Sequence, residues 1–508
     1  MNLLSSTSIF SFFTLISRIL GYIRDILIAF FLGASIYADA FFVAFRLPNT
    51  FRRLFAEGTF NAAFIPSYTS VRIENKRKGK KFADDILGSL LLILILIVTI
   101  VEIFTPYLVF VVAPGFIEND IKFNLAVELT RITFPFLLFV SLSSFFSGIL
   151  NSNNKFAAAA AAPMILNMIL ILSLIVSYKL NLNFVKQLSF GVTLAGILQL
   201  IFLILVTLKF YKPTLLFKLK LDNKVKFFFK KLLPSIFSSG VTQINILIGT
   251  IIASFETGAV SYLYYADRIY QINLAIAGIA VGTVSLPALS KAFKNKNTKK
   301  LSNIQSKSFE LSLLLSIPAS FGLILASEEI VNALFGYGSF SKNDVDLTSK
   351  ALKYFGYGVP AFALIKILSN FFFARNNTKT PFYISTIMVA INISISVSLF
   401  SSIGFIIIPI ATSISTWIGV LIYIYFLNQN KSLLLNIQLI PNLLKIAVST
   451  IIMSLILVLA LNNFESYLNY TYKFKAIYLL LIVGSTGIVY LLSCYLFGIL
   501  KIKNYKTN

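Results

Sequence analysis

The sequence contains no histidine and a single cysteine among its 508 residues. Without histidine, the chain lacks the commonest general base and metal ligand of proteins. One cysteine, Cys494, cannot form a disulfide framework, a cysteine-ligated metal centre or a dithiol redox centre. Charged residues are also scarce, at 12% of the chain against ~25% in ordinary globular proteins. We therefore predict no metal site and no cofactor, and we exclude the enzyme classes that depend on these groups.

The chain is instead rich in apolar side chains. They make up 57% of the chain, and its mean hydropathy is +0.85. A water-exposed shell cannot enclose so many apolar side chains, so the composition indicates a membrane protein. A spanning helix needs about 20 mostly apolar residues. Fourteen segments meet this condition: 6–32, 36–66, 86–112, 125–150, 157–178, 187–210, 230–254, 259–287, 304–327, 347–373, 381–400, 404–428, 441–462 and 476–500.

The charges are unevenly distributed along the chain. Lysine and arginine outnumber the acids by 44 to 19, which in a soluble protein would indicate a nucleic-acid partner. Here the basic residues gather in alternate connections, at 69–84, 209–231 and 291–303, and in the C-terminal tail. The positive-inside rule then places both termini in the cytoplasm and requires an even number of spans. We expect a multi-pass protein of the bacterial cytoplasmic membrane that binds no nucleic acid.

A weak internal repeat divides the chain. Gly33-Ala34 followed by Tyr37-Ala38-Asp39 returns as Gly258-Ala259 followed by Tyr265-Ala266-Asp267. Both copies run from an outer turn toward the cytoplasm, as in parallel repeats. The predicted fold is therefore an all-α polytopic membrane protein with an N-lobe at 1–212 (helices 1–6) and a C-lobe at 213–430 (helices 7–12), around a central cavity. Residues 431–508 add two helices and a basic tail. Two such lobes suit alternating access better than a channel or a scaffold.

Ionisable residues occur inside the first, second and eighth expected helices. Each such residue costs roughly 2.5–3.5 kcal/mol at the centre of a bilayer, so it marks either a functional site or a structural pair. Opposite charges stand at pairing distance along the second helix, and Asp267 lies on the eighth helix beside a face shared by Tyr264, Arg268 and Gln271. We interpret five residues as structural ion pairs: Asp39, Arg46, Arg53, Glu57 and Asp267.

Four other arginines have too few acids to neutralise them. A guanidinium is the group best suited to bind two phosphate oxygens at once, so these arginines predict an anionic substrate. They are Arg18, Arg24, Arg52 and Arg268. Ser17 shares a helix face with Arg24, and Asp25 shares one with Arg18. Asp25 either pairs with an arginine or lines the same site.

The last two expected helices are almost free of charge. They either fill space or line a lipid-facing groove for a long hydrocarbon tail. A rival function from another class is that of a membrane-embedded transferase or phosphatase. For this rival the sequence lacks histidine, clustered acids for Mg²⁺ and a nucleophile–base pair. A scaffold without a substrate would leave the arginines unexplained.

Several motifs together resemble the MurJ (MviN) family of lipid II flippases, in the MOP exporter superfamily. The motifs are Ser17-Arg18-Ile19-Leu20-Gly21, Arg24-Asp25, Ala38-Asp39-Ala40-Phe41, Arg46-Leu47-Pro48-Asn49, Arg52-Arg53-Leu54-Phe55-Ala56-Glu57-Gly58, Tyr264-Tyr265-Ala266-Asp267-Arg268 and Lys379-Thr380-Pro381. The resemblance implies fourteen helices and movement of lipid II, the undecaprenyl-diphosphate-linked disaccharide-pentapeptide, to the outer leaflet during peptidoglycan synthesis. The alternative within the same superfamily is an exporter of another polyprenyl-linked sugar or of a drug.

The resemblance also implies roles for individual residues. It assigns essential arginines to Arg18, Arg24, Arg52 and Arg268, lets Ser17 and Asp25 line the same cavity, and makes the last two helices a groove for the lipid tail. Lipid II and membrane lipid are the expected partners, with the peptidoglycan synthesis machinery as a further candidate. Two acids found in some family members, one of them a sodium ligand, are replaced here by Gly249 and Asn377. We therefore expect no family-type sodium site, which leaves the membrane potential as a candidate driving force.

Overall fold

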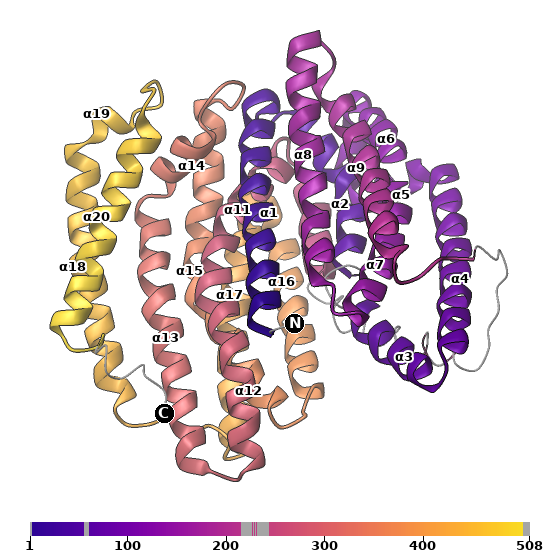
Figure 1. Cartoon of the computed structure of the whole chain (residues 1–508). Coiled ribbons are helices and arrows are strands. Elements are labelled where there is room, and N and C mark those ends of the chain that lie inside the picture. The colour runs from indigo at the N-terminus through magenta and orange to yellow at the C-terminus, as the bar shows by residue number, and fades with distance from the viewer. Residues whose placement is uncertain are drawn as a thin grey trace. The chain divides into compact units, whose positions relative to one another are not determined.

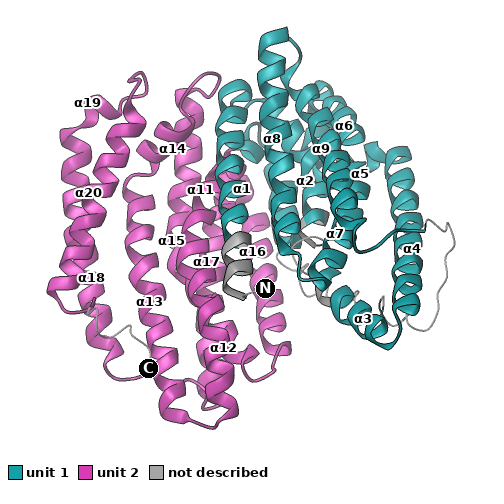
Figure 2. Ribbon diagram, in the orientation of Figure 1, with its two compact units in different colours: residues 1–261 teal, residues 262–508 magenta. Residues whose placement is uncertain are grey.

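The computed structural model describes residues 3–54, 60–214, 226, 228, 230 and 243–500, and the regular structure in these residues is helical throughout (Figure 1). The chain divides into two compact units, Met1–Ser261 and Tyr262–Asn508 (Figure 2). The boundary falls inside helix α11 (Ala259–Leu274). The division into an N-lobe at 1–212, a C-lobe at 213–430 and two added helices at 431–508 stays a prediction.

The first unit holds the helices of the expected N-lobe. They are α1 (Leu3–Leu32), α2 (Ile36–Leu54), α3 (Phe60–Glu74), α4 (Lys76–Ile103), α5 (Thr105–Val112), the 3₁₀ turn η2 (Pro114–Glu118), α6 (Asp120–Thr133), α7 (Phe136–Ser152), α8 (Phe156–Leu180) and α9 (Phe184–Thr207). The segment expected to span at 125–150 is interrupted between α6 and α7. Pro135 lies at this break, where its ring removes an amide donor from the helical hydrogen-bond ladder.

The second unit continues from α11 through a π-helical turn, η3 (Ala275–Ala280), into α12 (Val281–Lys294). It then contains α13 (Thr298–Leu325), α14 (Ser327–Phe335), α15 (Lys342–Phe373), α16 (Lys379–Ile403), the 3₁₀ turn η4 (Gly404–Ile406), α17 (Ile407–Gln429), α18 (Leu439–Asn463), α19 (Glu465–Leu468) and α20 (Lys475–Leu496). The helices α18 and α20, yellow in Figure 1, pack side by side. The positions of the long helices follow the apolar runs of the sequence closely.

Among the described residues, ten helical stretches are long and apolar enough to cross a membrane. The charged helices α1 and α2 are not among the ten, and Lys379–Gln429 counts as one stretch although the sequence predicts two spans there. Leu455 and Leu480, on α18 and α20, are 61% and 72% exposed, as lipid-facing side chains would be. The all-α, polytopic membrane fold is therefore confirmed, and the count of fourteen spans stays a prediction.

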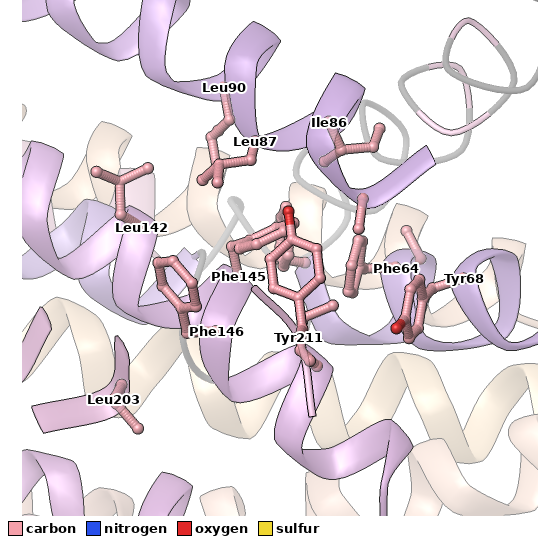
Figure 3. Close-up of a cluster of buried hydrophobic side chains, with 14 of the residues drawn as sticks. Phe64, Tyr68, Ile86, Leu87, Leu90, Leu142, Phe145, Phe146, Leu203 and Tyr211 are labelled. Carbon is pink, nitrogen blue, oxygen red and sulfur yellow. The ribbon is translucent and has the colours of Figure 1, made fainter. Parts of the chain in front are cut away.

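The core of the first unit forms where α3, α4 and α7 meet (Figure 3). The ring of Phe64 lies 5.1 Å from that of Phe145 and 5.5 Å from that of Tyr68, measured between centroids. A Cβ atom at Gly148 would stand 2.7 Å from the Phe64 ring, so α7 can approach α3 only with glycine there. This aromatic cluster holds the end of α3 against its neighbours by close packing.

Candidate functional site

Three residues of α1 that the sequence singles out lie in one hydrogen-bonded cluster, in which Ser17 is half-buried. Arg24 and Asp25 are 4% and 1% exposed. Arg24 donates from Nε and Nη2 to Oδ1 of Asp25, at 3.0 and 2.7 Å, and from Nη1 to Oδ1 of Asn167 on α8, at 2.9 Å. Asn167 in turn donates from Nδ2 to the carbonyl oxygen of Ser17, at 2.8 Å. A single amide side chain thus joins Ser17 to the Arg24–Asp25 pair.

This cluster fixes the orientation of Arg24, because all three guanidinium nitrogens donate within it. Asp25 supplies a formal charge that balances the buried cation, which is the condition under which a charge is stable away from water. Asn167 carries no charge and adds geometric constraint from a second helix. Asn167 has no signal in the sequence that distinguishes it from the other asparagines of this asparagine-rich chain.

The other two predicted substrate-binding arginines of the first unit are more accessible than Arg24. Arg18 on α1 is exposed, and Arg52 on α2 is half-buried. Arg52 donates from Nε to Oδ1 of Asn49 at 3.0 Å, one turn earlier on the same helix. Both side chains therefore remain accessible from outside the protein interior.

Asp39 forms a second buried polar centre in the first unit. Its side chain is fully buried and makes an ion pair with Nζ of Lys122 on α6, at 2.7 Å. It also accepts hydrogen bonds from the amides of Gly258 and Ser261, at 2.8 and 3.0 Å, and from the Ser261 hydroxyl at 2.6 Å. Asp39 therefore caps the N-terminus of α11 from a distant helix, where a negative charge is stabilising.

Lys122 is itself 4% exposed and lies 4.0 Å above the centroid of the Phe116 ring. The sequence does not identify this lysine as the partner of Asp39, because it stands in a short connection rather than in a span. Arg46, expected in the same charge stripe as Asp39, is half-buried on α2. The side chain of Arg53 and the whole of Glu57 lie outside the described residues, so their expected pairing stays a prediction.

The candidate residues of the second unit lie on α11. Arg268 is half-buried and donates from Nη2 and Nε to the hydroxyl of Tyr264, at 3.1 and 3.3 Å. Its guanidinium also lies 5.2 Å from the centroid of the same ring, a cation–π distance. Asp267 accepts a hydrogen bond from the Gln271 amide. Both contacts join residues four apart, as the shared helix face predicts.

Two positions that bear acids in some family members are Gly249 and Asn377 in this chain. Gly249 lies in the short apolar helix Gln243–Ala253. Asn377 donates to the hydroxyl of Thr380 at 2.9 Å and accepts from the Thr380 amide at 3.1 Å, so its side chain holds the start of α16. Within the described residues, no three acids or cysteines come together as metal ligands would.

The chain matches the family model described as lipid II flippase MurJ over residues 28–479. It is 37% identical over 516 residues to the probable lipid II flippase MurJ of Rickettsia prowazekii, covering 100% of each chain. It is 36% identical over 392 residues to the lipid II flippase MurJ of Burkholderia cenocepacia, covering 75% of each chain.

Two solved structures agree with the family match in fold. One is described as lipid II flippase MurJ in an inward closed conformation, with a TM-score of 0.82, 28% identity, and coverage of 96% of this chain and 98% of that one. A multidrug resistance MATE transporter of the MOP superfamily shares the fold at a TM-score of 0.65 and 14% identity, over 82% of this chain and 95% of that one. The protein is a multi-pass membrane protein that belongs to the lipid II flippase MurJ family.

Proposed function

We propose that the protein moves lipid II from the inner to the outer leaflet of the bacterial cytoplasmic membrane. The observation that carries this proposal is the family match along nearly the whole chain, together with arginines at the family motif positions on α1, α2 and α11. Its substrate would bring a diphosphate to these arginines, and a diphosphate is the anion that guanidinium groups bind in bidentate fashion.

The mechanism follows from where the charges lie. Arg18 and Arg52 would make first contact with the diphosphate, because their side chains are accessible, and Arg24 would present a guanidinium already oriented by Asp25 and Asn167. Arg268, on α11, is the fourth arginine that we propose to bind the diphosphate. Alternating access of the two units would then carry the headgroup across while the hydrocarbon tail stays in lipid. The apolar, lipid-exposed faces of α18 and α20 suit the tail.

The proposed orientation places both termini in the cytoplasm, since the basic connections then face inward. The proposed driving force is the membrane potential, which supplies about 2.3 kcal/mol per charge per 100 mV. Neither Gly249 nor Asn377 carries a carboxylate, which supports transport without a family-type sodium ion. The peptidoglycan synthesis machinery is the proposed source and destination of the substrate.

The test of the function is flipping of fluorescent lipid II by the purified protein in proteoliposomes. We expect rapid exposure of the label at the opposite leaflet, which empty vesicles should not show. Replacing sodium by choline at a fixed membrane potential should leave the rate nearly unchanged. Loss of flipping under that exchange would contradict the sodium-independent mechanism.

A second candidate function is export of another polyprenyl-linked sugar or of a drug. The fold that the chain shares with a multidrug resistance transporter of the MOP superfamily supports this second candidate. The same proteoliposomes, loaded in parallel with a different polyprenyl-diphosphate sugar or with a cationic dye, decide between the two. Faster movement of either compound than of lipid II would favour this second function.

A further inference from the structure

A buried lysine begins the last helix of the chain. Lys475 is the first residue of α20, the only lysine, arginine, aspartate or glutamate in that helix, and 1% exposed. A cation at a helix N-terminus interacts unfavourably with the helix dipole. The helix itself therefore gives no reason for a lysine at this position, and the reason must lie in its contacts with other elements.

Those contacts form a complete cage around the ammonium group. Its Nζ donates to Oδ1 of Asn332 at 2.8 Å, to the carbonyl of Gly336 at 2.6 Å and to the carbonyl of Tyr470 at 2.7 Å. These three bonds match the three protons of the ammonium. The rings of Tyr337 and Tyr470 lie 4.2 and 4.7 Å from Nζ, within cation–π distance. The cage thus holds one cation with neutral oxygens and two aromatic faces.

The cage ties α20 to the segment between α14 and α15. Asn332, near the end of α14, donates from Nδ2 to the carbonyl of Leu468 at 2.8 Å, and the Tyr470 hydroxyl donates to the carbonyl of Phe340 at 2.7 Å. A Cβ atom at Gly336 would stand 2.6 Å from the carbonyl oxygen of Asn332, so glycine is required where the cage turns. Residues 336–341, which we call the cage loop, are therefore held from both sides.

The cage loop in turn supports α11. The ring of Phe340 lies 5.3 Å from that of Tyr265, and the ring of Phe335 lies 5.0 Å from it. Tyr265 is fully buried and packs edge-on against Tyr264 at 5.8 Å. Tyr264 accepts the hydrogen bonds of Arg268 described above. An unbroken series of contacts within the second unit therefore runs from Lys475 to Arg268.

We propose that Lys475 is a positioning residue for Arg268, acting through the cage loop and the paired tyrosines of α11. Loss of the ammonium would leave two carbonyl oxygens and an amide oxygen buried without their donor, so the cage loop would shift to reach other partners. Phe340 and Tyr265 would follow, and Arg268 would lose its preset orientation toward a diphosphate. This inference rests on the proposed function, because it takes Arg268 to bind the diphosphate of the substrate.

The test is a double-mutant cycle on binding of undecaprenyl diphosphate to the purified protein in nanodiscs. Lys475→Met keeps an unbranched apolar stem and removes the ammonium group with its charge. We expect it to weaken binding about tenfold alone and to add nothing in the Arg268→Ala background. An equal loss in both backgrounds, or no loss in either, would overturn the inference.

Two further variants separate positioning from general damage. Lys473→Met removes an exposed lysine two residues earlier and should bind as the unaltered protein does. Lys475→Ala should regain affinity when n-propylammonium, the missing part of the side chain, is added; a folded variant that regains none would contradict the inference. If Lys475→Met does not fold, Tyr470→Phe takes its place in the cycle. It removes only the hydrogen bond from the Tyr470 hydroxyl to the carbonyl of Phe340. It should weaken binding about threefold when Arg268 is present and have no effect in the Arg268→Ala background.

Different experimental results would refute the proposed function and the proposed role of Lys475. A protein that flips lipid II in proteoliposomes but shows an additive cycle keeps its function and refutes the role of Lys475. A protein that binds undecaprenyl diphosphate with a non-additive cycle but flips no lipid II supports the role of Lys475 and refutes the function.

Discussion

The two arginines Arg24 and Arg268 are held in different ways. Arg24 is buried and bonded to a carboxylate and to an amide from another helix, whereas Arg268 is half-buried and bonded to a tyrosine one turn away on its own helix. Arg24 is therefore part of the packing of the first unit, so we expect its removal to affect both stability and the proposed binding. We expect removal of the half-buried Arg268 to affect mainly the proposed binding. We therefore expect Arg24→Ala to lower both stability and flipping, and Arg268→Ala to lower flipping alone.

The largest expected effect is that of Arg24→Ala. Removing one partner of a buried ion pair leaves the carboxylate of Asp25 uncompensated, which destabilises a protein by about 3–5 kcal/mol. We expect a marked fall in the melting temperature in detergent and no flipping. Arg268→Ala should also abolish flipping, but with a melting temperature close to that of the unaltered protein.

The double variant Arg24→Ala/Asp25→Ala is the matched control for this first prediction. It removes the uncompensated charge, so it should recover much of the lost stability and none of the flipping. Full stability of the single variant Arg24→Ala would show that the pair does not hold the first unit together.

Asn167→Ala sharpens the comparison without changing any charge. The substitution leaves Arg24 paired with Asp25 but removes the bond from α8, which we expect to cost about 1–3 kcal/mol. Flipping should fall roughly tenfold, since about 1.4 kcal/mol of lost orientation corresponds to that factor. Asn442→Ala, which removes a hydrogen bond to Glu310 in the second unit, is a suitable control. Equal flipping by both asparagine variants would contradict the positioning role of Asn167.

Tyr264→Phe is the corresponding change at Arg268. It keeps the ring and removes the hydroxyl that accepts from Nε and Nη2. We expect flipping to fall about threefold and the stability to change by less than about 1 kcal/mol, the usual size of one hydrogen bond. Thermal unfolding and the flipping rate, measured on the same preparation, check both parts. A large loss of stability would show that Arg268 is structural, as Arg24 is.

The contrast between the two arginines also shows what a single sequence can predict. The bond from Arg268 to Tyr264 joins residues four apart, a spacing that helix geometry alone makes a contact. The apolar runs likewise predict the long helices, because lipid requires them to be continuous. The same reasoning places Ser17 and Arg24 on one face of α1.

Helix spacing and apolar runs do not predict contacts between segments that are distant in the sequence. Asn167 lies 143 residues from Arg24, and Lys122 lies 83 residues from Asp39. Spacing in one sequence carries no information on which helices meet, so the sequence predicts neither Asn167 as the partner of Arg24 nor Lys122 as the partner of Asp39. The break at Pro135 was missed for another reason, since the apolar run continues across it and only the proline marks the interruption.

The smallest effect is expected in the basic connections. Lys78 and Lys299 are exposed, and we expect their charges mainly to orient the chain in the membrane. Lys78→Ala and Lys299→Ala should each flip lipid II within twofold of the unaltered protein. A loss comparable to that of an arginine variant would place a substrate contact in these connections.

The most direct test of the central claim is complementation of a flippase-depleted strain by Arg18→Ala, Arg24→Ala, Arg52→Ala and Arg268→Ala, with membrane levels checked by immunoblot. If these arginines bind the diphosphate of lipid II, each variant that reaches the membrane should fail to support growth. The corresponding Arg→Lys variants should restore growth only partly, because a lysine cannot bind two phosphate oxygens in parallel. Normal growth by two or more of the alanine variants at wild-type levels would contradict the account.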